Sequence, residues 1–229
     1  MKNGYTVAYA ASFGDPTLMK ESRQKIQEYM QNFKYIGLRE QQLLPLVAAS
    51  TSAPVQRVVD PTLLLTAEDL DKIAKPTPHP AKYVLLYARR YDPPLEQWAE
   101  DMAAYLGAQV VEISLRATNA DSHTMRHDAG VEEFLILVKN ACYVVTNSYH
   151  GMIMAIHYKR PFVVFSREQC SNKIAELLEL LGLQDRMLLS HRARVCKPIR
   201  YDLVHQKIAN ARDCSIDFLK QELEGIYKK

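Results

Sequence analysis

The chain lacks several features that would assign it to a common functional class. Its longest apolar runs are far shorter than the roughly 20 residues that a membrane-spanning helix needs, so we expect at most peripheral contact with a membrane. It has no glycine-rich phosphate loop of the Walker type. Its net charge of +3 is too small to indicate a nucleic-acid-binding protein, and we therefore expect no nucleic-acid partner.

Cysteine pairs and metal-ligand clusters are also missing. The four cysteines are scattered, and no two of them form a Cys-x-x-Cys pair. With no signal sequence in front of the first apolar run, reduced thiols and a cytoplasmic location are expected. The histidines and acids of residues 121–128 lack a second ligand cluster elsewhere in the sequence. We expect no metal site.

What the chain does have is the pattern of an α/β protein. Of its 229 residues, 48% are hydrophobic and 24% are charged, which is typical of a globular domain with a sizeable core. Apolar strand-like runs alternate with segments of helical period, as in parallel βαβ units. The runs are Thr6–Tyr9, Tyr35–Leu38, Gln56–Val59, Tyr83–Ala88, Gln109–Leu115, Cys142–Val145 and Phe162–Phe165.

Start and stop residues mark several of the intervening helices. Asp15 and Pro16 predict the start of one helix, and a second is expected from Pro94 to Gly107. A third, amphipathic helix is predicted from Ser171 to a stop at Gly182. The chain is expected to end in one long helix over about residues 203–227.

A proline-rich stretch, Lys75–Pro80, predicts the domain boundary, because three prolines at alternate positions favour a stiff extended connection. We expect residues 1–76 to form a partial N-terminal α/β lobe with three short strands. Residues 77–229 then form a Rossmann-like lobe with four strands and the terminal helix.

The most informative stretch runs from Ala141 to Gly151. A buried strand is expected to end at Val145, and the polar residues Asn147 and Ser148 can cap a following helix. His150 then lies in the first turn of that helix, just past the carboxyl end of a strand. Open α/β sheets keep ligands there, and helix N-termini favour anions. Gly151 allows a ligand to approach the backbone closely.

This stretch also resembles a known family. Thr146–Gly151 followed by Lys159–Phe162 is similar to the signature of the polysaccharide pyruvyl transferases. Further blocks resemble the same family in the same order: Tyr9–Gly14, Ile36–Glu40, Val59–Leu65, and Lys173–Leu178 with Gly182–Arg186. The resemblance spans nearly the whole chain.

The resemblance implies a glycosyltransferase-B-like fold of two Rossmann-like lobes and a bacterial transferase. Its activity would be to move pyruvate from phosphoenolpyruvate, as a ketal, onto hydroxyls of a surface polysaccharide or exopolysaccharide. Phosphoenolpyruvate and a glycan or lipid-linked saccharide are then the substrates, and no cofactor is expected. Family members usually carry a further glycine-rich region upstream of the Tyr9–Gly14 block, so we expect the first lobe to be incomplete.

The resemblance and the positions of residues along the chain together suggest roles for several of them. His150 is the expected general acid, because imidazole titrates near neutral pH. The donor carries phosphate and carboxylate groups, for which Arg39, Arg167, Lys173 and Arg89 are the candidate cations. Asn147, Ser148 and Gly151 form the helix entrance. Many family members have arginine at the position of Ser148, so a direct phosphate ligand is missing from this chain.

Other interpretations remain open at this point. The same architecture would suit a nucleotide-sugar-dependent glycosyltransferase, and a shortened chain can also act as a non-catalytic partner module. His150 can instead be a capping or core histidine, and Arg39 can be a surface residue paired with Glu40. Asp60 is most simply a turn residue. The sequence leaves the oligomeric state and the acceptor sugar open.

Overall fold

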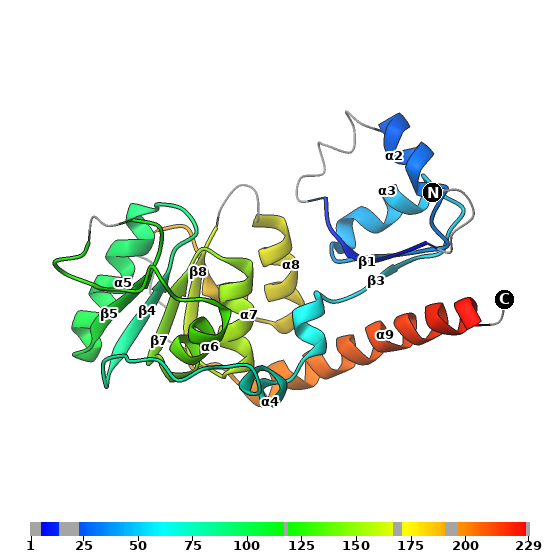
Figure 1. Ribbon diagram of the computed structural model, residues 1–229. Helices are drawn as coiled ribbons and strands as arrows, with labels where there is room; N and C mark the ends of the chain where they lie inside the picture. Colours follow the sequence, from blue (N-terminus) through cyan, green and yellow to red (C-terminus); the bar gives the residue numbers. More distant parts are fainter. Residues whose placement is uncertain (1–5, 14–22, 117–118, 167–170, 191–196, 228–229) are drawn as a thin grey trace. The chain divides into compact units, whose positions relative to one another are not determined.

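The computed structural model describes residues 6–13, 23–116, 119–166, 171–190 and 197–227. The chain divides into two compact units, each built from segments that are separate in sequence (Figure 1). Unit 1 comprises Met1–Leu64, Gln169–Leu181 and Asp202–Lys229, and unit 2 comprises Leu65–Glu168 and Gly182–Tyr201. The predicted division into continuous domains 1–76 and 77–229 stays a prediction.

Unit 2 is built on a six-stranded sheet in which all neighbouring strands are parallel. The strand order is β6-β5-β4-β7-β8-β9. The strands are β4 (Tyr83–Tyr87), β5 (Gln109–Ile113), β6 (Thr124–Met125), β7 (Tyr143–Thr146), β8 (Phe162–Phe165) and β9 (Met187–Leu188). The chain therefore enters the sheet at the central strand β4 and continues through β5 to the edge strand β6. It then returns to the other side of β4 and adds β7, β8 and β9 in turn. This order creates a switch point between β4 and β7, where open α/β sheets bind ligands.

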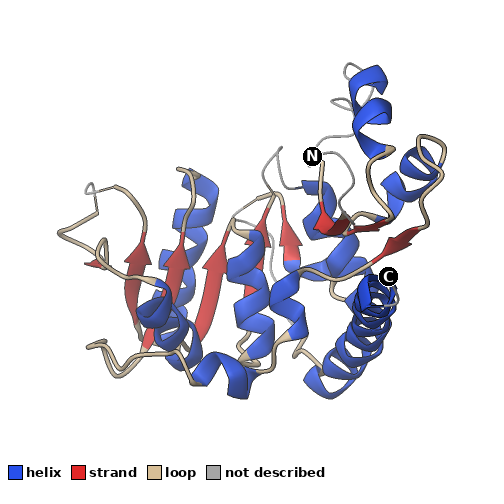
Figure 2. Ribbon diagram, turned by 45° about the vertical axis from the view of Figure 1, so that its right-hand side comes forward, coloured by secondary structure: helices blue, strands red, loops and turns tan. Residues whose placement is uncertain are grey.

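Helices cover both faces of this sheet (Figure 2). The helical segments of unit 2 are α4 (Ala67–Asp71), α5 (Pro93–Leu106), α6 (Val131–Asn140), α7 (Tyr149–His157) and η3 (Gln184–Arg186). Because successive strand residues point to opposite faces, β4 contacts two layers. Leu86 packs with Trp98 of α5. Tyr83, on the other face, donates its hydroxyl to the carbonyl oxygen of Leu137 in α6 at 2.7 Å.

The predicted local signals account for these elements. Strands β7 and β8 are buried along their whole length, as their continuous apolar runs predict. Helix α5 begins after Asp92, whose side chain accepts a hydrogen bond from the N–H of Leu95 at 3.4 Å. It ends at Gly107, which has the left-handed backbone (φ 60°) that glycine adopts without strain.

Unit 1 contains a three-stranded parallel sheet of order β1-β2-β3. Its elements are β1 (Val7–Ala11), α2 (Arg23–Met30), β2 (Tyr35–Leu38), η1 (Gln41–Leu43), α3 (Leu44–Ala48), β3 (Val55–Arg57), η2 (Pro61–Leu64), α8 (Ser171–Leu181) and α9 (Tyr201–Tyr227), the last from its second residue onward. On one face Ile36 and Leu38 pack with Met30 of α2 and Val47 of α3. A second cluster joins Ala10 and Val58 to Phe218 of α9.

The proline-rich stretch contains no helix or strand, as predicted, and it lies bound along unit 2. The Lys75 ammonium pairs with Glu132 at 2.9 Å. Arg126 donates to the carbonyl oxygen of Pro78 and to the hydroxyl of Thr77, both at 2.7 Å. Side chains of unit 2 therefore fix the course of this segment.

The α/β class, the parallel sheets and the long C-terminal helix are confirmed. The expected seven strands are all present within one or two residues of their predicted ends. Two further strands, β6 and β9, were not predicted, because each has only two residues and so shows no alternating pattern. The predicted helix start at Asp15 lies outside the described residues.

Candidate functional site

The junction between β7 and α7 lies at the carboxyl end of a central strand of unit 2. Thr146, the last residue of β7, donates its hydroxyl to the carbonyl oxygen of Tyr87 at 2.7 Å and accepts from the N–H of Ser148 at 3.0 Å. These bonds turn the chain sharply from strand to helix and tie the end of β7 to the end of β4. The junction is therefore anchored at the switch point of the sheet.

Ser148 is the N-cap residue of α7, as predicted. Its side-chain oxygen accepts a hydrogen bond from the N–H of Gly151 at 3.3 Å. The His150 side chain is exposed, whereas Tyr149 and Gly151 on either side of it are buried. The His150 ring makes an edge contact with the Tyr149 ring, with centroids 5.5 Å apart. The interpretation of His150 as a buried core residue is thereby excluded.

Gly151 lets α7 pack closely on the strand ends. A Cβ atom at this position would lie 2.6 Å from the Oγ1 atom of Thr146 and 2.8 Å from a ring carbon of Tyr87. Both distances are too short for any real side chain. The glycine is therefore required by packing within the protein, and its predicted approach to a ligand stays a prediction.

Asn147 has a structural task that the sequence did not reveal. It is fully buried, and its Oδ1 atom accepts from the N–H of Arg89 at 2.8 Å. Its Nδ2 atom donates to the carbonyl oxygen of Arg90 at 2.9 Å. The amide thus connects the start of α7 to the loop after β4. Ligand binding by Asn147 and Ser148 stays a prediction.

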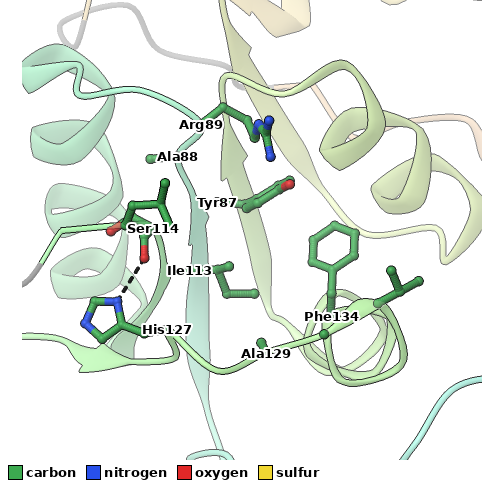
Figure 3. A pocket seen from close by; sticks show the side chains of 11 residues that line it. Tyr87, Ala88, Arg89, Ile113, Ser114, His127, Ala129 and Phe134 are labelled. Atoms are coloured by element: carbon green, nitrogen blue, oxygen red, sulfur yellow. Dashed lines mark hydrogen bonds between the residues drawn. The ribbon is translucent and has the colours of Figure 1, made fainter.

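A pocket of about 370 Å³ lies beside this junction, at the carboxyl ends of β4 and β5 (Figure 3). Its lining includes Tyr87, Ile113 and Phe134, with the Tyr87 and Phe134 rings 4.7 Å apart between centroids. Arg89 and His127 contribute its polar groups, and Nδ1 of His127 is 2.9 Å from the carbonyl oxygen of Ser114. Arg89 is the one predicted cation described in the same unit as His150.

Arg39 lies in unit 1, directly after β2. Its guanidinium forms an ion pair with the buried carboxylate of Asp60. Glu40 instead accepts a hydrogen bond from Ser12, so the alternative interpretation, in which Arg39 pairs with Glu40, does not hold. Asp60 also accepts from the N–H and the hydroxyl of Thr62 at 3.0 and 2.7 Å, which confirms its role as a turn residue.

Lys173 occupies the first turn of α8, also in unit 1. One turn further on, Glu176 accepts hydrogen bonds from the N–H groups of Gln41 and Gln42 at 2.6 and 3.3 Å. The segment after Arg39 is thereby held against the start of α8. Arg167, the remaining predicted cation, lies outside the described residues.

A buried charged pair in unit 2 was missed at the sequence level. Glu112, the residue before the last of β5, is fully buried, and its Oε2 atom lies 2.6 Å from Nδ1 of the buried His123. Burial would raise the pKa of Glu112, but hydrogen bonds from His123, Ser114 and Asn119 lower it to about 2. Burial would lower the pKa of His123, yet its bond to Glu112 raises it. An acid inside an apolar strand was the signal that a partner was needed.

Two kinds of feature are absent from the residues that the structure describes. No group of three or more histidine, cysteine, aspartate or glutamate side chains there is arranged to hold a metal ion. None of the helices found there combines the length and the hydrophobicity of a membrane span.

Comparison with known proteins identifies the family. The sequence model described as polysaccharide pyruvyl transferase matches residues 2–169. The chain belongs to this family. The matched region contains Arg39, Arg89 and the whole β7–α7 junction of this polysaccharide pyruvyl transferase family member, whereas Lys173 lies beyond it. No curated protein gives a significant match.

One solved structure supports the fold of this family member. The crystal structure of alpha,alpha-trehalose 6-phosphate synthase from Burkholderia multivorans is similar, with a TM-score of 0.52 and 10% sequence identity. The match covers 96% of this chain and 65% of that one, so the chain spans less than two thirds of its relative's length. A structure of the wall teichoic acid polymerase TagF aligns at 13% identity over 99% of this chain and 61% of that chain, with a TM-score of only 0.39. The predicted glycosyltransferase-B-like fold is confirmed.

Proposed function

We propose that this chain transfers the pyruvyl group of phosphoenolpyruvate to two hydroxyl groups of a saccharide, joining them as a ketal. Family membership supports the transferase class. The observation that carries the proposal is the position of His150: an exposed imidazole in the first turn of a helix that leaves the switch point of a parallel sheet. An anionic donor is favoured at such a helix start.

The proposed reaction begins with a proton. The imidazolium of His150 protonates the methylene carbon of phosphoenolpyruvate while a sugar hydroxyl attacks the adjacent carbon, which becomes tetrahedral. The bond from that carbon to the phosphate oxygen then breaks, and a second sugar hydroxyl attacks the same carbon. The proton of the first hydroxyl restores the imidazolium of His150, which gave its own proton to the new methyl group, and the proton of the second hydroxyl leaves on phosphate. The products are the pyruvate ketal and inorganic phosphate.

The donor carries more charge than a helix start alone can balance, so cationic side chains have a part in the proposal. Arg89 belongs to the same unit as His150 and lines the pocket beside the junction. Arg39, which forms an ion pair with Asp60, and Lys173 are further proposed donor ligands on the strength of their sequence positions. Arg167 is retained as a fourth proposed ligand.

The acceptor follows from the family description, which names a polysaccharide. We propose a saccharide of a bacterial surface polysaccharide, presented as a glycan or on a lipid carrier, with the reaction in the cytoplasm. No cofactor takes part in the proposed chemistry, because the donor supplies the leaving group and the protein supplies the proton.

Titration calorimetry tests the donor. Phosphoenolpyruvate, UDP-glucose, UDP-galactose and CDP-glycerol are titrated separately into the full chain, and phosphate release from phosphoenolpyruvate is followed with methyl hexosides as acceptors. We expect binding of phosphoenolpyruvate and acceptor-dependent phosphate release. Binding of a nucleotide derivative alone would replace this proposal with a glycosyltransferase. Binding of none of the four would favour a non-catalytic partner role.

A further inference from the structure

The pocket beside α7 differs in character from a site for phosphoenolpyruvate. It is lined largely by apolar and aromatic side chains, including Tyr87, Ile113 and Phe134. Phosphoenolpyruvate is small and densely charged, and it offers almost no apolar surface to such a lining. A volume of about 370 Å³ lies within the range of pockets that hold an organic ring system with a few polar contacts.

The rim of the pocket is exposed and partly apolar. Leu115 is 99% exposed and Val131 is 67% exposed, and both line the opening. Polar groups are few. Arg89 supplies donors, and His127 must carry its hydrogen on Nδ1, because the group it meets there is the carbonyl oxygen of Ser114. The Nε2 atom of a neutral His127 is therefore an acceptor for a hydroxyl group.

One side chain connects the pocket to the helix start. The ring of Tyr87 lines the pocket and also lies against the backbone of Gly151, in the first turn of α7. Arg89 also connects the pocket to the start of α7, because it lines the pocket and its N–H donates a hydrogen bond to Asn147. A ligand in the pocket and an anion at the start of α7 would therefore be neighbours.

We infer that this pocket binds the sugar ring of the acceptor, with the aromatic pair Tyr87–Phe134 under the ring's C–H face and His127 at its hydroxyls, while Arg89, which adjoins both places, stays the proposed donor ligand. The inference rests on the proposed function, because ketal formation brings two acceptor hydroxyls to one carbon of the donor. A site for the acceptor must therefore adjoin the site for the anion. An aromatic wall with a sparse polar rim fits a ring that is apolar on one side and carries hydroxyls at its edge.

The test uses methyl hexosides as probes and two matched variants of the full chain. Phe134→Leu keeps apolar volume but removes the ring, and Tyr105→Leu removes an aromatic ring that is 83% exposed on α5. Binding of the methyl glycosides of galactose, glucose, mannose and N-acetylmannosamine is measured by NMR, and phosphoenolpyruvate binding by calorimetry. We expect Phe134→Leu to weaken hexoside binding about two- to tenfold and to leave phosphoenolpyruvate affinity unchanged. Tyr105→Leu changes neither affinity.

The outcomes separate this inference from the proposed function. Loss of hexoside affinity in Phe134→Leu upholds the pocket assignment even if phosphoenolpyruvate does not bind. Unchanged hexoside affinity, an equal loss of phosphoenolpyruvate affinity, or no hexoside binding to the wild-type protein overturns it. Displacement of bound hexosides by uridine monophosphate at the Phe134 ring also overturns it, because the pocket would then be a site for a nucleobase. If Phe134→Leu fails to fold, the exposed His127→Ala variant takes its place with the same expected loss.

Discussion

The side chain of Asn147 holds the backbone of Arg89. Its Oδ1 atom accepts from that N–H at 2.8 Å, and its Nδ2 atom donates to the carbonyl oxygen of Arg90 at 2.9 Å. One buried amide side chain thereby hydrogen-bonds both a backbone N–H and a backbone carbonyl oxygen of the loop after β4. The start of α7 and the wall of the adjacent pocket are consequently positioned by the same residue.

Replacing this amide tests its positioning role. We expect Asn147→Ala to lower the free energy of unfolding by about 1–3 kcal/mol, because two hydrogen bonds are lost in a buried setting. Urea denaturation gives the measurement. The matched control is Asn140→Ala at the exposed end of α6, which should stay within about 0.5 kcal/mol of wild type. Equal losses in the two variants would remove the special role of Asn147.

Adding one methyl group at Gly151 tests the close packing of α7. Alanine is the better helix former by about 1 kcal/mol, which alone would stabilise the variant. The new Cβ atom would lie 2.6 Å from Oγ1 of Thr146, and relieving that overlap costs typically about 1–3 kcal/mol. We therefore expect Gly151→Ala to be net destabilised in thermal unfolding. A melting temperature above that of wild type would show that α7 can shift enough to relieve the overlap, and would contradict the close packing.

A control for this substitution exists at the start of α6. At Gly130, an added Cβ atom would meet first the end of the flexible Glu133 side chain, at 3.0 Å. That side chain can move aside without shifting backbone. Gly130→Ala should therefore cost less than Gly151→Ala in the same melting experiment.

The sequence predicted the junction well because its signals are local. A continuous apolar run, a capping serine and a following His-Gly pair are enough to predict a buried strand, a helix start and His150 in its first turn. The sequence could not predict the partners of these residues. The contact of Asn147 with Arg89 spans 58 positions, and that of Arg39 with Asp60 spans 21. Such pairs are set by the strand order of the sheets.

The same limit explains what was missed or misassigned. One interpretation of Arg39 paired it with its neighbour in sequence, Glu40, but adjacent residues at a strand end point in different directions. Its partner Asp60 comes from the segment just after the neighbouring strand β3, which only the parallel pairing of β2 and β3 brings close. Glu112 looked like one polar residue in a strand, and its partner His123 is supplied by a loop that leads into an edge strand too short to predict.

The Glu112–His123 pair predicts a pH dependence of stability. The pKa of Glu112 in the folded protein, about 2, lies below its ordinary value of 4.5. Its contribution to stability is therefore full above pH 4.5 and is lost as the pH falls from 4.5 toward 2. The pKa of His123 is raised above its ordinary value of 6.5, so its contribution is full below pH 6.5 and is lost as the pH rises through the raised pKa.

Denaturation of wild type and Glu112→Gln at a series of pH values checks this dependence. Other charged groups near the pair are Glu100, 3.4 Å from Nε2 of His123, and Arg116, 3.5 Å from Glu112; both are kept in the variant. We expect Glu112→Gln to be less stable by about 1–3 kcal/mol at neutral pH. The difference should shrink at acidic pH, where the wild-type carboxylate takes up its proton. A difference independent of pH would contradict the assigned charge states.

The Arg39–Asp60 pair predicts that one substitution affects both stability and donor binding. Asp60 is buried, so Arg39→Ala leaves its carboxylate without the guanidinium, and we expect a loss of about 1–3 kcal/mol in urea denaturation. If Arg39 also binds the donor, phosphoenolpyruvate affinity falls as well. Asp60→Asn separates the two effects, because it weakens the pair but keeps the cation. Equal phosphoenolpyruvate affinity in Arg39→Ala and wild type would leave Arg39 with a structural role alone.

Replacement of the His150 imidazole gives the most direct test of the account. Phosphate release from phosphoenolpyruvate with a methyl hexoside acceptor is measured for wild type, His150→Gln and the exposed control His79→Gln, together with phosphoenolpyruvate affinity. Loss of a general acid typically lowers the rate by about 10²–10⁴-fold. We predict a fall of that size in kcat for His150→Gln alone, with phosphoenolpyruvate still bound. Turnover by His150→Gln equal to that of His79→Gln would contradict the central claim.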